Sequence, residues 1–266
     1  MSSTYETLNA STCTTCTLSV DKSAYWVPSL YYRSQDGRNF TSVPQDGGSL
    51  MYYLFRRDNQ HIPLVAFPKG FKMLTGSPFY RSDQGTLESR AKSWACIDYS
   101  QSSATTGYIP NKNCPNNLRM QIIFPSCWDG VNLDSADHKS HGIHSLEPLL
   151  SIVAYPSLVD NGVCPNTHPV RLVTLFYEVE WRIQEFANQW YNSTHPFVLA
   201  SGDPTGYGLH GDFQNGWDVD ILQEALNTCN ASSGAAEDCP ALTNYILKAN
   251  AQSACNLGII LERISS

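Results

Sequence analysis

The feature that most constrains the fold is an alternating segment at residues 171–181, with the sequence RLVTLFYEVEW. Its apolar side chains share one face of an extended chain: Val173, Leu175, Tyr177, Val179 and Trp181. A period of two is typical of a β-strand with one face buried against a core. The segment therefore predicts a long strand in a sheet that has one covered face.

Other segments favour the same class of fold. Further strands are expected at residues 26–32, 50–55, 118–124 and 196–200, separated by turn sequences such as Asp36-Gly37 and Asp46-Gly47-Gly48. Helical spacing is confined to the end of the chain, at residues 219–229 with Asp218 as N-cap, and at residues 239–255. We expect a mainly β, antiparallel, sandwich-like single domain over residues 1–266, in which residues 230–266 form a C-terminal helical extension.

Composition excludes several classes of protein. Hydrophobic residues make up 42% of the chain, which is enough for a core, and charged residues only 15%. The net charge of −7 argues against a nucleic-acid partner, which calls for a basic surface. No apolar run approaches the length of a membrane span.

Cysteine usage indicates an oxidising compartment. Nine cysteines are spread over the whole chain: Cys13, Cys16, Cys96, Cys114, Cys127, Cys164, Cys229, Cys239 and Cys255. Spacing does not determine connectivity, but Cys96 with Cys114 and Cys127 with Cys164 each flank a loop, so we expect these two pairs. The closely spaced Cys13 and Cys16 favour disulfides over zinc, because no second pair follows at finger spacing.

Four glycosylation sequons also favour secretion, at Asn9, Asn39, Asn192 and Asn230. The N-terminus nevertheless lacks the basic and apolar regions of an export signal. The odd cysteine count and the missing signal would both be explained by a missing N-terminal segment.

Histidines and aspartates form three clusters in expected loops: residues 134–144, residues 167–169 and residues 210–212. Imidazoles with a carboxylate can hold a divalent metal, or can move protons near neutral pH. Alternatively, each is a structural side chain that ties its own loop together. If the clusters form one site, the candidate catalytic residues, which must then converge, are His138, His141, His168, His210 and Asp212.

Three further patterns leave alternatives open. Residues 206–211 match a dinucleotide fingerprint in letters, but no βαβ unit surrounds them, so we expect the glycines to present His210 and Asp212 instead. Glu178 and Glu180 share a strand face, which suits either glycoside cleavage or a solvated surface. Sugar rings could stack on several aromatic side chains, most of which should be core: Trp26, Tyr31, Tyr32, Tyr52, Tyr53, Trp94, Trp128 and Trp217.

Long motifs resemble one known family. They are CWDGVNLDSADHKSH at 127–141, CPNTHPV at 164–170 and GDPTGYGLHGDFQNGWD at 202–218, preceded by TCTTC at 12–16, SAYWVPSLY at 23–31 and FPKGFKM at 67–73. In this order they resemble the secreted fungal and bacterial family called domain of unknown function nineteen-ninety-six. The resemblance runs from about residue 4 to residue 229.

The resemblance implies an extracellular or cell-wall protein that acts on or binds polysaccharide, since fungal members often carry a WSC carbohydrate-binding domain. The signature runs add candidate substrate-binding residues: Trp128, Lys139, Asp203, Tyr207 and Trp217. Members usually have an upstream His-x-His segment that this chain lacks. Residues 142–152 look inserted, so His144 is set aside.

Two functions follow as hypotheses. One is a carbohydrate-active hydrolase or lyase with a His/Asp site, for which a divalent metal is conceivable and no cofactor is assigned. The other is a non-catalytic glycan-binding or wall-structural domain. If the three clusters do converge, a gap is expected where the upstream His-x-His would lie, and we expect this chain to be weakly active or inactive.

Overall fold

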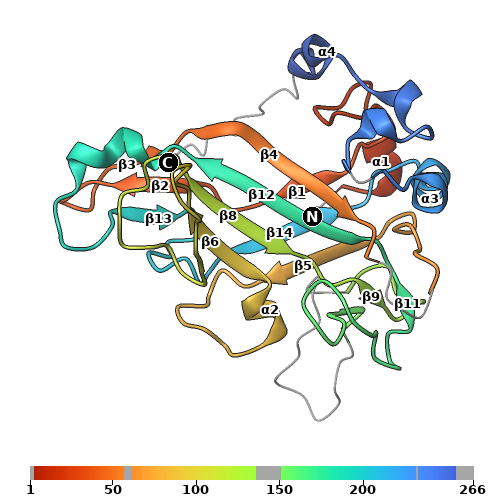
Figure 1. Cartoon of the computed structure of the whole chain (residues 1–266), viewed down its shortest axis with the longest axis horizontal. Helices are drawn as coiled ribbons and strands as arrows, with labels where there is room; N and C mark the ends of the chain where they lie inside the picture. The colour runs from red at the N-terminus through yellow and green to blue at the C-terminus, as the bar shows by residue number, and fades with distance from the viewer. Residues whose placement is uncertain (1–2, 57–61, 136–150, 232, 256–266) are drawn as a thin grey trace, which may run out of the picture.

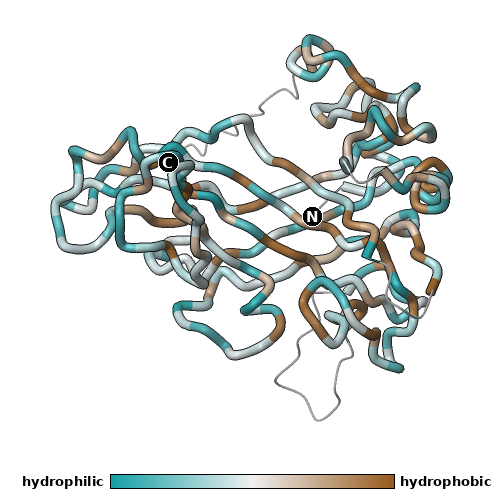
Figure 2. Tube along the Cα trace, viewed as in Figure 1, coloured by the Kyte–Doolittle hydropathy of each residue, from teal (hydrophilic) through white to brown (hydrophobic). Residues whose placement is uncertain are grey.

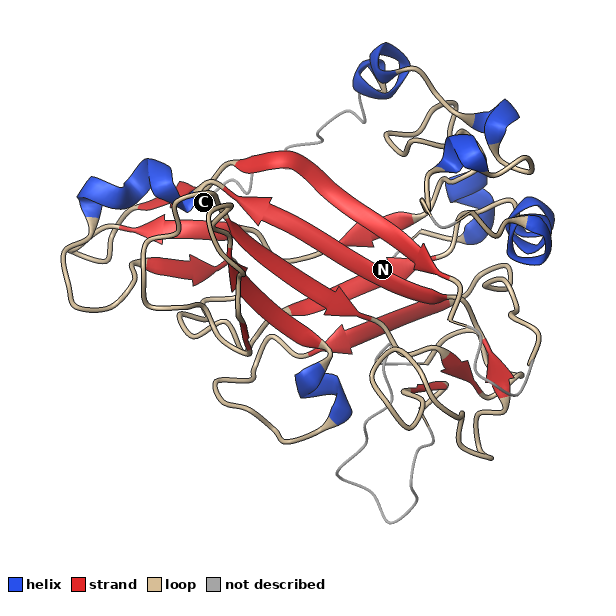
Figure 3. Cartoon of the chain, in the orientation of Figure 1, coloured by secondary structure: helices blue, strands red, loops and turns tan. Residues whose placement is uncertain are grey.

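The computed structural model describes residues 3–56, 62–135, 151–231 and 233–255. In these ranges the chain forms mostly antiparallel β-sheets with a few short helices, which confirms the expected fold class (Figure 3). None of the helices in these ranges has the length and apolar content needed to cross a membrane.

The largest sheet has five strands in the order β4-β12-β8-β6-β7. Their bounds are β4 Gln45–Leu54, β12 Thr174–Trp181, β8 Leu118–Ile123, β6 Lys92–Cys96 and β7 Thr105–Thr106. The alternation predicted for residues 171–181 is confirmed in β12, where Leu175, Tyr177, Val179 and Trp181 are buried and Glu178 and Glu180 are not.

Figure 1 shows one three-stranded sheet behind the five-stranded sheet and another at its left end. One has the order β1-β14-β5, with β1 Ala24–Trp26, β14 His210–Gln214 and β5 Lys72–Gly76. The other has the order β13-β2-β3, with β13 Phe197–Leu199, β2 Leu30–Arg33 and β3 Phe40–Ser42. A third small sheet, β10-β9-β11, joins Val153–Ala154, Cys127–Trp128 and Val170–Arg171.

Two sequence expectations are corrected here. The strand expected at residues 26–32 is two strands, β1 and β2, in different sheets; Pro28 lies between them, and proline has no N–H to continue a ladder. The turn expected at Asp46-Gly47-Gly48 lies inside β4. There the register with β12 shifts, and both glycines have positive φ, so the residues form a β-bulge rather than a hairpin turn.

The core fills the space between the layers. Met73 and Phe213 enter it from the β1-β14-β5 sheet, and Met120 and Leu175 from the five-stranded sheet. Figure 2 shows hydrophobic stretches along these strands, whereas the loop leading into α2 is mostly hydrophilic.

Tyrosine hydroxyls connect the two layers across this core. Tyr177 of β12 donates to the carbonyl oxygen of Asp212 in β14 at 2.9 Å. Tyr25 of β1 and Tyr53 of β4 share a hydrogen bond of 2.6 Å, and Tyr25 also donates to the buried Asp21. These bonds fix how β1 and β14 lie over the five-stranded sheet.

The helices gather at the ends of the sheets. The α-helices are α1 Tyr5–Asn9, α2 Leu87–Arg90, α3 Val219–Thr228 and α4 Ala249–Ala254, and the short 3₁₀ segments are η1 Ile183–Gln189, η2 Ala236–Asp238 and η3 Thr243–Tyr245. The expected N-cap is confirmed, because the Asp218 carboxylate accepts from the backbone N–H groups of Asp220 and Ile221. Figure 1 shows α1, α3 and α4 together at one end of the molecule.

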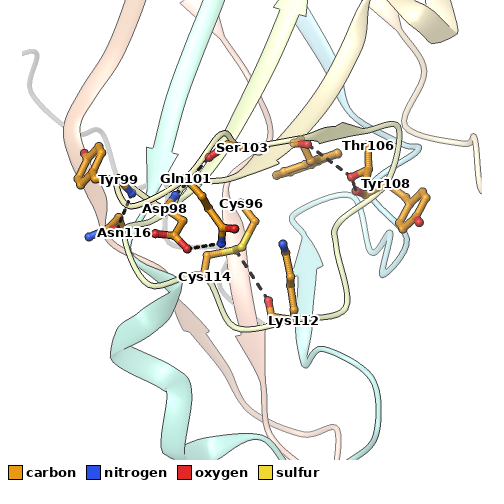
Figure 4. Close-up of a disulfide and its surroundings, with 11 residues drawn as sticks. Cys96, Asp98, Tyr99, Gln101, Ser103, Thr106, Tyr108, Lys112, Cys114 and Asn116 are labelled. Carbon is orange, nitrogen blue, oxygen red and sulfur yellow. Dashed lines mark hydrogen bonds between the residues drawn. A yellow bond between two sulfur atoms is a disulfide. The ribbon is translucent and has the colours of Figure 1, made fainter.

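Four disulfides cross-link the chain. Both predicted pairs are formed, Cys96–Cys114 and Cys127–Cys164, and Cys13–Cys255 and Cys229–Cys239 complete the set. Figure 4 shows how Cys96–Cys114 closes the loop that carries Thr106 and Tyr108. Cys16 is a free thiol, and burial raises its pKa to about 12.

Candidate functional site

The polar residues of the glycine-rich motif lie on a strand, β14, and not in the loop that we expected. Gly211 and Phe213 point into the core: a Cβ on Gly211 would lie 2.8 Å from the Phe124 ring, and Phe213 is fully buried. Because side chains alternate along a strand, His210, Asp212 and Gln214 point the other way. The structure therefore mounts them on the outer face of the β1-β14-β5 sheet.

Strand register brings further side chains to that face. Trp26 of β1 lies opposite Asp212, which in turn lies opposite Leu74 of β5, while Gln214 lies opposite Lys72. The residues that share this surface, called the Trp26 face from here on, are Trp26, Lys72, Leu74, His210, Asp212 and Gln214.

Trp26 and His210 form the centre of the Trp26 face. Their rings lie 5.4 Å apart at 45°, and the Trp26 side of the pair is 52% exposed whereas His210 is buried. Gly76, opposite His210, carries no side chain, and a Cβ there would lie 2.3 Å from the carbonyl oxygen of Leu209. The close approach of β5 thus keeps the imidazole packed beneath the indole.

The tautomer of His210 follows from one hydrogen bond. Its Nδ1 lies 2.8 Å from the carbonyl oxygen of Gly208, which can only accept, so Nδ1 carries the proton. In the neutral imidazole the lone pair is then on Nε2. This is the form that can accept a proton.

Charged groups border the Trp26 face along β5. Lys72 Nζ lies 3.4 Å from the Asp134 carboxylate, and the Lys72 backbone N–H donates to the carbonyl oxygen of Leu133. Residues 133–135, which open the expected histidine loop, therefore lie beside the Lys72 end of the sheet. His138, Lys139 and His141 of that loop are outside the described residues, and their roles stay predictions.

His168 has a different environment. Its Nε2 donates to the carbonyl oxygen of Ser151, and its Nδ1 accepts from the Thr167 hydroxyl at 2.9 Å. Burial would raise the pKa of the neighbouring Asp129, but hydrogen bonds from Val131 and Asn132 hold it below its usual value. These contacts tie His168 to its own loop, beside the small β10-β9-β11 sheet.

The histidines and carboxylates of the described ranges do not gather into a metal centre. No group of three or more His, Cys, Asp or Glu side chains there is placed to hold an ion. His168, His210 and Asp212 therefore do not form such a group among themselves. Their convergence with the undescribed His138 and His141 stays a prediction.

The structure also places the other candidate side chains. Trp217 is buried and donates to the Tyr53 hydroxyl at 2.7 Å, and Trp128 packs edge-on against Phe71 at 6.2 Å. Asp203 is fully buried, and its carboxylate accepts from the backbone N–H groups of Gly206 and Gly208. Contacts of this kind position the glycine-rich loop.

Exposure separates the aromatic candidates. Of the eight aromatic residues that the sequence suggested, only Trp26 and Tyr52 are exposed.

Asn39, Asn192 and Asn230 of the sequons are exposed, while the Asn9 amide donates to the Tyr5 carbonyl oxygen. Sequence reasoning missed Lys72, and it missed β14, although Leu209, Gly211 and Phe213 alternate with polar residues there.

Comparison with known families matches residues 1–217 to a model described as a domain of unknown function, DUF1996. The chain belongs to the DUF1996 family. No curated protein and no solved structure matches it. The DUF1996 match ends at Trp217, so it includes the Trp26 face and stops before α3. Four disulfides in a DUF1996 protein are consistent with secretion.

Proposed function

We propose that this protein binds extracellular polysaccharide, and that it does so across the Trp26 face. The observation that carries the proposal is the half-exposed Trp26 ring, which lies on a sheet and is supported from below by His210 at 5.4 Å. An indole held in this way presents a rigid apolar surface at little cost in side-chain entropy.

The neighbours of Trp26 suit a sugar chain. The C–H faces of sugar rings are apolar and stack on aromatic rings, whereas their hydroxyls need hydrogen-bond partners. Asp212 lies directly across from Trp26 and offers carboxylate acceptors, and Lys72 offers ammonium donors along the same face. An aromatic platform between donors and acceptors can thus bind both parts of a saccharide.

The strand arrangement makes this surface rigid. The backbone of β14 is held between β1 and β5, and the Tyr177 hydroxyl anchors the carbonyl oxygen of Asp212 from the opposite layer. Binding groups on such strands need no ordering when a ligand arrives, so less affinity is lost to conformational entropy.

Two matched variants test this proposal. The protein is mixed with insoluble wall polysaccharides (chitin, β-glucan and cellulose), and the bound fraction is measured after sedimentation. Trp26→Ala should weaken binding about tenfold or more, which is ~1.4 kcal/mol. Tyr52→Ala removes an exposed aromatic ring from β4, on the outer face of the five-stranded sheet, and should leave binding unchanged. Equal loss in both variants, or no binding by the parent protein, would overturn the proposal.

A second function is favoured by one specific observation, the hydrogen bond between His210 Nδ1 and the Gly208 carbonyl oxygen. It leaves the Nε2 lone pair of the neutral ring as a proton acceptor, as a hydrolase or lyase requires. In that case the parent protein releases sugar from a polysaccharide, and His210→Gln lowers the rate at least a hundredfold with little change in binding. If the protein binds polysaccharide but releases no sugar, the catalytic function is contradicted and only the non-catalytic function remains.

A further inference from the structure

A polar pocket lies at the corner formed by α2, β6, β7 and the glycine-rich loop. Its volume is about 220 Å³, and its walls include Asp83, Arg90, Lys92, Ser93, Thr105 and Tyr207. None of these residues belongs to the Trp26 face. The pocket is smaller than the roughly 300–1,000 Å³ of sites for drug-sized ligands, so it suits one small polar unit.

The pocket carries two cations and one anion. Lys92 is 6% exposed; its Nζ donates to the carbonyl oxygen of Tyr207 at 3.2 Å and lies 5.2 Å from the centre of the Tyr80 ring. Arg90 is exposed, and its guanidinium makes no ion pair or hydrogen bond with the described part of the chain. A guanidinium at the rim of such a hollow can bind a carboxylate with two parallel hydrogen bonds.

The anion, the Asp83 carboxylate, already accepts a hydrogen bond within its own turn. The Asp83 carboxylate accepts from the Gly85 backbone N–H at 2.9 Å, and this bond is the main reason why its pKa lies below its usual value. Arg90 is the exposed cation of the lining, so a ligand with one negative charge is favoured beside it.

The remaining lining supplies hydroxyls and an aromatic ring. Thr105 lies on the wall, and the hydroxyl groups of Ser93 and Thr106 donate to Gln121 Oε1 at 3.1 Å and to the Tyr108 carbonyl oxygen at 2.6 Å, which leaves their oxygens as acceptors. Tyr207 also lines the wall, with its ring 6.0 Å from the ring of Tyr108. Hydroxyl oxygens beside an aromatic ring are contacts that suit a polyhydroxylated ligand.

Both walls of the pocket are held firmly. The Cys96–Cys114 disulfide closes the segment that carries Thr105, Thr106 and Tyr108, part of which is visible in Figure 4. On the other side, the buried Asp203 carboxylate accepts from Gly206 at 2.9 Å and from Gly208 at 2.6 Å, the residues on either side of Tyr207. The pocket is thus built before any ligand arrives.

From this lining we propose that the pocket binds a single acidic sugar unit, a hexuronate, with its carboxylate at Arg90 and its hydroxyls at the serine and threonine wall. The proposal does not depend on polysaccharide binding at the Trp26 face. It adds a charge preference that the aromatic platform would not supply.

The experiment uses isothermal titration of the full chain with sodium galacturonate, with glucose and with sodium acetate, all at one ionic strength. We expect measurable binding of galacturonate, and binding at least tenfold weaker for glucose and acetate. Glucose lacks the carboxylate and acetate lacks the hydroxyls. Equal binding of acetate and galacturonate would show an adventitious anion site only, and no binding of galacturonate would also overturn the proposal.

Variants locate the bound sugar. Arg90→Gln should weaken galacturonate binding about tenfold, whereas Arg38→Gln, which changes an exposed arginine between β2 and β3, should have no effect. Thermal unfolding should confirm that both variants fold like the parent. Trp26→Ala should still bind galacturonate, so failure of this pocket and failure of the Trp26 face are told apart. An unchanged affinity in Arg90→Gln would contradict the assignment.

Discussion

The two outer faces of the sandwich differ in what their charged side chains contact. The outer face of the five-stranded sheet, here the Glu178 face, carries Leu50, Tyr52, Arg119, Gln121, Phe176, Glu178 and Glu180. There Glu178 accepts from Gln121 at 2.7 Å and pairs with Arg119 at 3.2 Å. Glu180 accepts from the Asn117 amide at 2.9 Å.

The Trp26 face is arranged otherwise. Its central aromatic ring is half exposed, and Asp212 lies opposite that ring on the neighbouring strand. An ion pair at the edge of this face joins Lys72 to Asp134, which belongs to a neighbouring loop.

This difference bears on a choice that the sequence left open. Glu178 and Glu180 share a strand face, which suited either the paired carboxylates of a glycosidase or a solvated surface. Each is instead bound by amide or guanidinium groups from the neighbouring strand β8 or from Asn117 just before it. Cross-strand pairs of this kind stabilise a solvated sheet surface, so they favour the structural interpretation of the two glutamates.

The largest expected effect is a loss of stability when the spacing between β14 and the five-stranded sheet is disturbed. Gly211→Ala places a Cβ 2.8 Å from the fully buried Phe124 ring, so either β14 or that ring must move. We expect the free energy of unfolding to fall by about 2 kcal/mol, with polysaccharide binding weakened as well. Urea unfolding measures the first quantity. Gly107→Ala, whose nearest neighbour lies at 3.5 Å, is the control and should be neutral.

The next effect is a pH dependence of stability, and it arises where the Tyr25 hydroxyl joins Asp21 to Tyr53 between the two layers. Burial raises the pKa of Asp21, which accepts from Tyr25, the partner of Tyr53. The native state then holds its proton to higher pH than the unfolded chain does. Stability contributed by the protonated form is present below the ordinary aspartate pKa and is lost as pH rises toward the raised value, at about 1.4 kcal/mol per pKa unit of difference.

Unfolding measured from pH 4 upward tests that sign. Asp21→Asn should flatten the downward slope, because the amide does not titrate and keeps an oxygen acceptor for Tyr25. A parent protein that gains stability over this range through Asp21 would contradict the raised pKa.

A smaller effect on polysaccharide binding is expected when the charge of one acidic side chain is removed, and it should differ between the two faces. Asp212→Asn should weaken polysaccharide binding several-fold, about 1 kcal/mol, because an amide is a weaker acceptor for sugar hydroxyls than a carboxylate. Glu178→Gln is the same chemical change on the opposite face and should leave binding as it is. Affinity electrophoresis in gels that contain soluble β-glucan would measure both variants. A larger loss in Glu178→Gln would reverse the functional assignment of the faces.

The smallest effect is expected within the Glu178 face itself. A double-mutant cycle of Glu178→Gln and Arg119→Met should give a coupling energy of about 0.5 kcal/mol in unfolding, since both side chains are partly exposed and water screens their attraction. The coupling should fall as salt is added. A coupling that salt does not change would show that the pair is not electrostatic.

The sequence predicts those parts of the fold in which apolar residues recur at regular spacing within one segment. The alternation of β12 and the helical spacing after Asp218 are visible in single segments, and both were confirmed. The Cys96 and Cys127 pairings could be proposed because each disulfide closes one loop. Strand β14 was missed because three glycines precede or enter it, and such residues usually indicate turns.

The Trp26 face could not be predicted, for a related reason. Trp26, Lys72 and Asp212 lie far apart in the sequence, and only the pairing of β1, β14 and β5 brings them to one surface. Strand pairing between distant segments depends on the whole core, and no short motif records it. The histidines indicated where polar side chains cluster along the sequence, but not that the Trp26 ring packs against His210.

The disulfide between Cys13 and Cys255 turns nearly the whole chain into one covalent ring, and the other three disulfides lie inside it. A single cut by a protease, at any bond between these two cysteines, therefore releases no fragment. Between Cys127 and Cys164 a cut would be bridged twice over. Outside the cell, where proteases are common and reductants scarce, a nicked molecule would keep its mass and stay joined across the break.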